Sequence, residues 1–208
     1  MKKLRIAILF TGGGSSGVFL SEKDPNCDKN YEFVCAVSSA EGASGISYFQ
    51  KIGIPCIVKD WKKFRTDLSS KEKRAQYFFG IETILDTYQV DLVLLAGFML
   101  IIPNSFIDTY HKKIVNVHPA DLRILGDDKK PKYRGDNAVV GAFMDGQSEF
   151  CSTIHYVDPG DYDCGEIICV SDPYKPGDVN DPVLIQGNMK TLCDGPAYQK
   201  ALEILCCK

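Results

Sequence analysis

The stretch Asp91–Pro119, DLVLLAGFMLIIPNSFIDTYHKKIVNVHP, decides the fold class. Its two short apolar runs, Asp91–Ala96 and Lys113–Val117, are rich in Val, Leu and Ile. Continuous apolar runs of this length are typical of parallel strands that are buried on both faces. Because side chains alternate along a strand, Asn116 and His118 point to the same face. The sequence therefore predicts an amide beside an imidazole at the carboxyl end of a buried strand, where open α/β sheets bind ligands.

The rest of the chain continues this alternation of strands and helices. It predicts an α/β fold of three layers, in which helices cover both faces of a mostly parallel, twisted, Rossmann-type sheet. The last two strands are close in sequence and should form an antiparallel hairpin, and the length favours a single domain over residues 1–208. The further strands are expected at Leu4–Phe10, Glu32–Ser38, Pro55–Val58, Phe150–Val157 and Glu166–Val170, and helices at Ala43–Ile52, Lys71–Gln89, Asn104–His111, Ala138–Met144 and most of Val179–Lys208 with a break near Gly195-Pro196.

Composition narrows the class of protein. A formal net charge of -3 provides no basic field for nucleic acid. No stretch of 18 uncharged apolar residues is present, which argues against a membrane span. Met1-Lys2-Lys3 runs directly into a strand, which does not resemble a secretory signal. Nine cysteines without C-x-x-C spacing indicate reduced thiols rather than zinc or disulfides, so we expect a cytoplasmic protein without a metal.

A Gly/Ser loop, TGGGSSG, follows the first predicted strand. A loop of this kind at the start of a helix presents free backbone N–H groups and small hydroxyls, which suit a phosphate group. A plain tight turn would use the same residue types. We expect a phosphate site because the loop comes directly after the first strand, with Gly12, Gly13, Gly14, Ser15 and Ser16 as its residues.

One of the three histidines, His118, has neighbours that suit catalysis. Downstream, the turn DPGDYDCG carries Asp158, Asp161 and Asp163. The turn is either a simple reversal with exposed carboxylates or a device that brings one carboxylate back to His118. A carboxylate beside an imidazole suits proton transfer near neutral pH, and an amide can stabilise an oxyanion. Together the groups suit acyl transfer to an amine, whereas His155, inside a strand, is more simply a structural residue.

At these residues the chain resembles the family of formyltransferases that use 10-formyltetrahydrofolate. The resemblance covers about Leu4 to Val170 and extends weakly into the C-terminal helix. N-V-H-P followed by H-Y-V and D-C-G, in this order, is its most specific part, and T-G-G-G-S-S, L-A-G-F-M and Y-R-G add to it. The main departures are Ala120-Asp121-Leu122-Arg123 after N-V-H-P and a long loop, residues 120–134, that we expect to act as a flap or to be inert.

The resemblance implies a role for each matched residue. Asn116 would stabilise the oxyanion of the tetrahedral intermediate, His118 would assist proton transfer, and Asp163 would support His118. The Gly/Ser loop would hold the phosphate of the substrate. Asp194 lies, with a poor local match, where the family has an acidic residue near the amine of the substrate. The segment that would line the folate pocket comprises Phe98, Met99, Leu100, Ile101 and Ile102.

The implied activity is formyl transfer from 10-formyltetrahydrofolate, a cosubstrate, to the primary amine of a phosphorylated substrate. Glycinamide ribonucleotide, an intermediate of purine biosynthesis, is the expected acceptor, and a nucleotide-linked amino sugar is the alternative. A different class of protein is a non-catalytic phosphate- or nucleotide-binding module that uses only the Gly/Ser loop. The expected partners are small molecules, with neither nucleic acid nor membrane, in a monomer or homodimer.

Overall fold

The computed structural model describes residues 2–207, and the chain divides between Ile114 and Val115 into two compact units. This division does not decide the prediction of a single domain, which stays a prediction. The first unit contains β1 (Leu4–Phe10), α1 (Ser15–Lys23), β2 (Tyr31–Ser38), α2 (Gly45–Lys51), β3 (Cys56–Val58), α3 (Ser70–Thr87), β4 (Leu92–Leu95) and α4 (Asn104–Thr109). The second contains most of β5 (Ile114–His118), then α5 (Ala138–Met144), β6 (Thr153–Tyr156), β7 (Ile167–Val170), α6 (Pro182–Met189), the π-helical turn η1 (Lys190–Asp194) and α7 (Gly195–Cys206).

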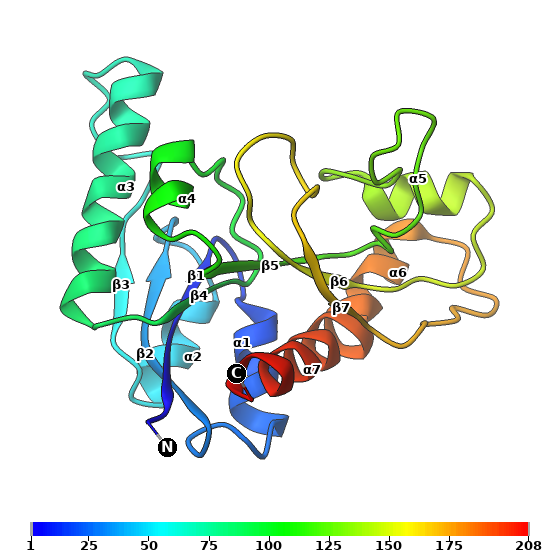
Figure 1. The fold of residues 1–208 in the computed structure, drawn as a ribbon, viewed down its shortest axis with the longest axis horizontal. Helices are drawn as coiled ribbons and strands as arrows, with labels where there is room; N and C mark the ends of the chain where they lie inside the picture. The colour runs from blue at the N-terminus through cyan, green and yellow to red at the C-terminus, as the bar shows by residue number, and fades with distance from the viewer. Residues whose placement is uncertain (1, 208) are drawn as a thin grey trace. The chain divides into compact units, whose positions relative to one another are not determined.

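The first unit is a parallel sheet between two layers of helices. β1 pairs in parallel with β2 and with β4, and β2 pairs in parallel with β3. Crossovers between parallel strands are right-handed, so a reversal in the direction of strand addition moves the helices to the other face. Accordingly, α1 and α2 lie on one face of these strands and α3 and α4 on the other (Figure 1). This places the Gly/Ser loop at the carboxyl end of β1 and the start of α1.

Burial explains why these segments form strands and helices. Residues 6–10 of β1 are fully buried, as expected for a strand covered on both faces. α3 begins at a capping box, in which Ser69 and Glu72 satisfy free backbone N–H groups, and buries Phe78 and Ile81. α4 has Pro103 at its N-cap, and no side chain caps its first turn.

The second unit contains the antiparallel strands. β5 pairs with β6, and β6 pairs with β7, both antiparallel, so the predicted C-terminal hairpin is confirmed. The seven strands have the order β3-β2-β1-β4-β5-β6-β7, and the predicted α/β fold class is confirmed. The helical break expected at Gly195-Pro196 is instead the π-helical turn before it. Pro196 is accommodated because the first turn of α7 needs no N–H from it.

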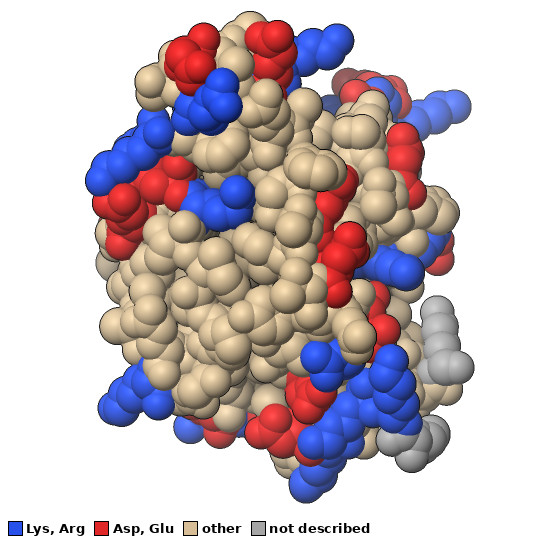
Figure 2. All heavy atoms as spheres, turned by 90° about the vertical axis from the view of Figure 1, so that its left-hand side faces the viewer, with Lys and Arg blue, Asp and Glu red and all other residues tan. Residues whose placement is uncertain are grey.

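Two further features of the described residues are the hydropathy of the helices and the distribution of charged side chains on one face of the molecule. None of the helices in residues 2–207 is long and apolar enough to cross a membrane. Figure 2 shows the left-hand side of Figure 1, where basic and acidic side chains surround a central uncharged area. On this view, blue and red side chains lie beside one another around the edge, and several blue side chains are adjacent at the lower right.

Candidate active site

β5 and β6 bring a group of polar side chains to one face of the sheet. In the antiparallel register, Asn116 lies opposite His155 and His118 lies opposite Thr153. Directly opposite residues of an antiparallel pair share a face, and so do residues two apart on one strand. Asn116, His118 and His155 therefore project from the same side. His155, which the sequence indicated as structural, belongs to this group. Alternation along one strand could not have found it, because the register between β5 and β6 places it opposite Asn116.

Asp163 completes this group from the turn between β6 and β7. Its Oδ2 lies 3.3 Å from Nδ1 of His118, and the two side chains are 12% and 6% exposed. Its Oδ1 lies 3.6 Å from Nε2 of His155. Of the three aspartates in the turn, Asp163 is the one bonded to His118, while Asp161 pairs with Lys130 on the surface. The structure thus brings together Asn116, His118 and Asp163, whose catalytic roles stay predictions.

The turn that carries Asp163 has an unusual backbone. Asp163 has a φ of 55°, a left-handed conformation that aspartate adopts more readily than most residues. Two residues later, a Cβ on Gly165 would lie 1.8 Å from the carbonyl oxygen of Tyr156, so only glycine fits there. This close approach holds the turn against the end of β6. It gives a physical reason for the D-C-G sequence, because the glycine lets the turn aim the carboxylate at His118.

Burial and neighbouring charges shift the pKa values of Asp163 and His118 in opposite directions. Burial by itself raises the pKa of Asp163, but His155, His118 and the N–H of Gly135 outweigh it and lower this pKa to about 2. Burial lowers the pKa of His118 below its ordinary value, and the Asp163 carboxylate opposes that shift. Near pH 7, Asp163 is therefore ionised and His118 neutral. A neutral imidazole beside a carboxylate can accept a proton, and the resulting cation has a neighbouring counter-charge.

Two backbone carbonyls fix which nitrogen of each ring carries a proton. Nε2 of His118 lies 2.7 Å from the carbonyl oxygen of Tyr133, and Nδ1 of His155 lies 2.8 Å from that of Tyr156. Because a carbonyl oxygen only accepts, both of these nitrogens are assigned as N–H. Nδ1 of His118, facing Asp163, is then the nitrogen that gains or loses a proton. Nε2 of His155 can accept from the amide of Asn116 at 3.3 Å, which orients that amide.

In the first unit, the predicted phosphate and folate segments are joined at Thr11. Its N–H donates to the carbonyl of Gly97 at 3.0 Å, and its hydroxyl accepts from the N–H of Met99 at 2.9 Å. Gly14 stands at the N-cap of α1 with a φ of 61° and no capping side chain, which leaves N–H groups of the first turn available to an anion. Met99 and Ile101 are exposed apolar side chains, as a ligand-lining segment requires, whereas Phe98 is buried.

Asp194 lies in a different environment. Its carboxylate, in η1, is buried and accepts a hydrogen bond of 2.5 Å from the hydroxyl of Ser152. Burial raises its pKa to about 6. It has no hydrogen bond to Asn116, His118 or Asp163. Burial and the bond to Ser152 favour a structural role, so we do not include Asp194 in the proposed site. Within residues 2–207, no group of three or more His, Cys, Asp or Glu side chains is arranged to hold a metal ion.

The chain resembles known proteins in sequence and in fold. Residues 4–174 match the family model described as formyl transferase. The chain is 30% identical over 180 residues to the trifunctional purine biosynthetic protein adenosine-3 of Homo sapiens. The match covers 85% of this chain but only 16% of that protein, so the chain spans about one sixth of the length of this relative. The crystal structure of phosphoribosylglycinamide formyltransferase from Anaplasma phagocytophilum is 27% identical to this chain, with a TM-score of 0.80, and the match covers 99% of this chain and 87% of that one. The crystal structure of phosphoribosylglycinamide formyltransferase from Brucella melitensis is 26% identical, also with a TM-score of 0.80, and the match covers 100% of this chain and 97% of that one. The chain therefore belongs to the formyl transferase family.

Proposed function

We propose that the protein transfers a formyl group from 10-formyltetrahydrofolate to the primary amine of glycinamide ribonucleotide, a step of purine biosynthesis. The observation that carries this proposal is the cluster of Asn116, His118 and Asp163, with His118 and Asp163 3.3 Å apart. The similarity to phosphoribosylglycinamide formyltransferases supports the acceptor. The nine cysteines, none of them in C-x-x-C spacing, support a reducing compartment, which we take to be the cytoplasm.

The reaction divides among three side chains. The amine of the acceptor attacks the formyl carbon, and the carbonyl oxygen becomes an oxyanion. One N–H of the Asn116 amide points to His155, and the second N–H is available to stabilise that oxyanion. A proton leaves the amine, directly or through one water, and is accepted at Nδ1 of His118, where Asp163 stabilises the imidazolium. Collapse of the intermediate breaks the bond to N10 of the folate, which takes up the proton.

The first unit would bind the substrates. We propose that Gly12, Gly13, Gly14, Ser15 and Ser16 hold the phosphate of the acceptor through backbone N–H groups and hydroxyls. We propose that the segment Phe98, Met99, Leu100, Ile101 and Ile102 lines the folate pocket. Support comes from the uncapped start of α1 and from the two exposed apolar side chains, Met99 and Ile101.

An acceptor comparison tests the proposal. Deformylation of 10-formyltetrahydrofolate should depend on added glycinamide ribonucleotide, and should be much slower with an amino-sugar nucleotide or with water alone. His118→Asn should abolish turnover without unfolding the protein. His111→Asn is the matched control, because His111 is an exposed histidine outside the cluster. A preference for the amino-sugar nucleotide would replace the acceptor. Binding of a phosphate compound without binding of a folate analogue would indicate the non-catalytic module instead.

A further inference from the structure

A short segment at the end of the long loop contacts both members of the His118–Asp163 pair. The carbonyl of Tyr133 accepts from Nε2 of His118 at 2.7 Å, and the N–H of Gly135 donates to Oδ2 of Asp163 at 2.9 Å. Between them, Nη1 of Arg134 lies 3.9 Å from the sulfur of Cys164, the residue after Asp163. Tyr133, Arg134 and Gly135 thus reach the imidazole, the turn and the carboxylate in succession.

The segment is itself held in place at its outer end. The Tyr133 side chain is buried, and its hydroxyl donates to Oδ2 of Asp145 at 2.9 Å. Lys132 pairs with the same carboxylate at 2.7 Å. Gly135 has a φ of 69°, which lets the chain turn its N–H toward Asp163 at low cost. The segment therefore has a defined position from which to hold the pair.

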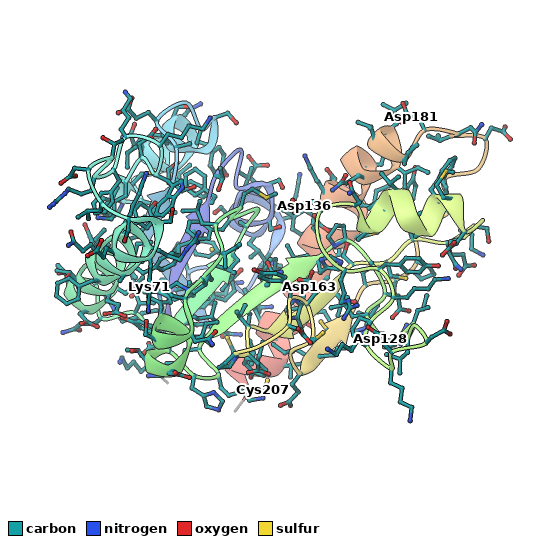
Figure 3. All side chains as sticks on the ribbon, turned by 90° about the horizontal axis from the view of Figure 1, so that it is seen from above. Lys71, Asp128, Asp136, Asp163, Asp181 and Cys207 are labelled. Carbon is teal, nitrogen blue, oxygen red and sulfur yellow. The ribbon has the colours of Figure 1, made fainter. Side chains whose placement is uncertain are left out.

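Arg134 links the tip of the long loop to the turn that carries Asp163. Its Nη2 donates to Asp128 at 3.0 Å, while its Nη1 faces Cys164. A second link of the same kind joins Lys130 to Asp161. The view from above shows Asp163 lying between the segments that carry Asp128 and Asp136 (Figure 3). The loop, residues 120–134, is thus tied to the turn by basic side chains, and it also has internal hydrogen bonds such as that from Gly126 to Lys130.

We propose that Tyr133-Arg134-Gly135 is a positioning segment: its main chain fixes the proton on Nε2 of His118, and Arg134 holds the turn so that Asp163 stays opposite Nδ1. The Tyr133 carbonyl cannot accept unless Nε2 carries a proton, so proton exchange is confined to Nδ1. The Gly135 N–H restrains the carboxylate, and Arg134 restrains the next residue. Arg134 acts through the turn and is a positioning residue, not a catalytic one. The kinetic part of this inference rests on the proposed function, whereas the protonation of the ring does not.

Three ionisable groups act on His118 and determine how it responds. Asp163 and Asp136 stabilise its cationic form, and His155 destabilises it. Loosening the turn weakens the contribution of Asp163, which moves the titration of His118 to lower pH. Loss of a nearby positive charge alone would move the titration to higher pH, because the cation would then have less repulsion. The direction of the shift therefore separates positioning by Arg134 from a simple charge effect.

Nitrogen-15 spectra of the histidine rings test the proposal directly in the full chain. With three histidines, the His118 signals are assigned by their loss in His118→Asn. In the wild type we expect the neutral ring to carry its proton on Nε2. In Arg134→Gln the titration should move to lower pH, and Arg134→Lys should move it less. Arg123→Gln is the control, because Arg123 lies in the same loop and pairs only with Asp121.

Kinetics provide the second measurement. Arg134→Gln should lower kcat about tenfold with little change in KM for the folate, since a misplacement of about 1 Å can cost up to about a hundredfold. In a Cys164→Ala background, the same substitution should have a much smaller effect, because its contact is already lost. A neutral His118 protonated on Nδ1, or a titration unchanged or raised in Arg134→Gln, would overturn the proposal. The spectra decide this even if the protein has another acceptor, so failure of the proposed function is recognised separately.

Discussion

Asn116 is the residue whose contribution to the reaction is easiest to isolate. Its amide lies 3.3 Å from Nε2 of His155, which orients it. Asn116→Ala should lower kcat by about 10²–10³, the range for loss of one oxyanion donor, with little change in KM. Steady-state kinetics measure both constants. Asn30→Ala is the control, because the Asn30 side chain is exposed and bonds only to the side chain of Asn26. A KM effect without a kcat effect would assign Asn116 to ground-state binding instead.

The pH dependence of kcat/KM tests the coupling of His118 to Asp163. The base is active when neutral, so the acidic limb of the profile should lie below the ordinary histidine pKa of 6.5, because burial lowers the pKa of His118. In Asp163→Asn the charge that opposes this shift is removed. The limb should therefore move to still lower pH while kcat falls, since the imidazolium has lost its counter-charge. An unchanged limb would mean that a different group titrates.

The raised pKa of Asp194 predicts how the stability of the folded protein depends on pH. Its pKa of about 6 in the folded protein lies above the ordinary value of 3.8, so its favourable contribution is present below about pH 4 and lost as the pH rises through 6. Asp194→Asn keeps an acceptor for Ser152 and removes this loss. It should stabilise the protein at pH 7.5 by about 1–3 kcal/mol and have no such effect near pH 4. Thermal unfolding at both pH values measures this, with Asp108→Asn, an exposed aspartate, as control. Destabilisation at pH 7.5 would show that the buried charge is needed.

At the scale of elements, the hydroxyl of Thr11 joins the Gly/Ser loop to the segment after β4. It contacts Ser39 at 2.7 Å and the N–H of Met99 at 2.9 Å. Thr11→Val keeps the shape and removes both bonds. KM for the phosphorylated acceptor and for the folate should both rise, while the protein stays folded, because both proposed binding segments lose a common anchor. Thr83→Val is the matched control, since its hydroxyl bonds only within α3. Unchanged KM values would mean that neither segment depends on this anchor.

The elements that the sequence predicted well are those with a strong local pattern. The bounds of β1 and α5 agree with the predictions, because an apolar run and a helical period specify them without outside help. The π-helical turn η1 was missed, since no local pattern distinguishes it from an α-helix. The end of α4 was placed two residues too late, at His111, because the helix ends at Thr109.

Some residues of the candidate site could also be predicted from local sequence patterns, and others could not. Asn116 and His118 could be placed together from strand alternation alone, and the proximity of Asp163 could be proposed from the motif. The contacts of Tyr133 and Gly135 could not be predicted, because they use main-chain atoms that any sequence provides. They arise from tertiary structure, which brings a loop distant in sequence against the pair. The position of Asp194 beside Ser152 likewise depends on packing and not on a pattern.

In the whole molecule, the proposed binding segments and the proposed catalytic side chains belong to different units. The first unit carries the Gly/Ser loop and the segment after β4, and the second carries the cluster around His118. The family match covers residues 4–174 and so includes both sets of residues. A protein that bound only phosphate would need the first set alone. The cluster in the second unit is therefore the part of the molecule that distinguishes an enzyme from a binding module.

The fate of the formyl carbon is the most direct test of the proposed transfer to the amine of glycinamide ribonucleotide. The full chain is given 10-formyltetrahydrofolate labelled with carbon-13 in the formyl group, together with glycinamide ribonucleotide, and the products are analysed by mass spectrometry and NMR. We predict that the label appears in the formamide of formylglycinamide ribonucleotide, in step with loss of the donor, and that His118→Asn eliminates this product. Label recovered as free formate, or retained in the donor in the presence of the wild-type protein, would contradict the account.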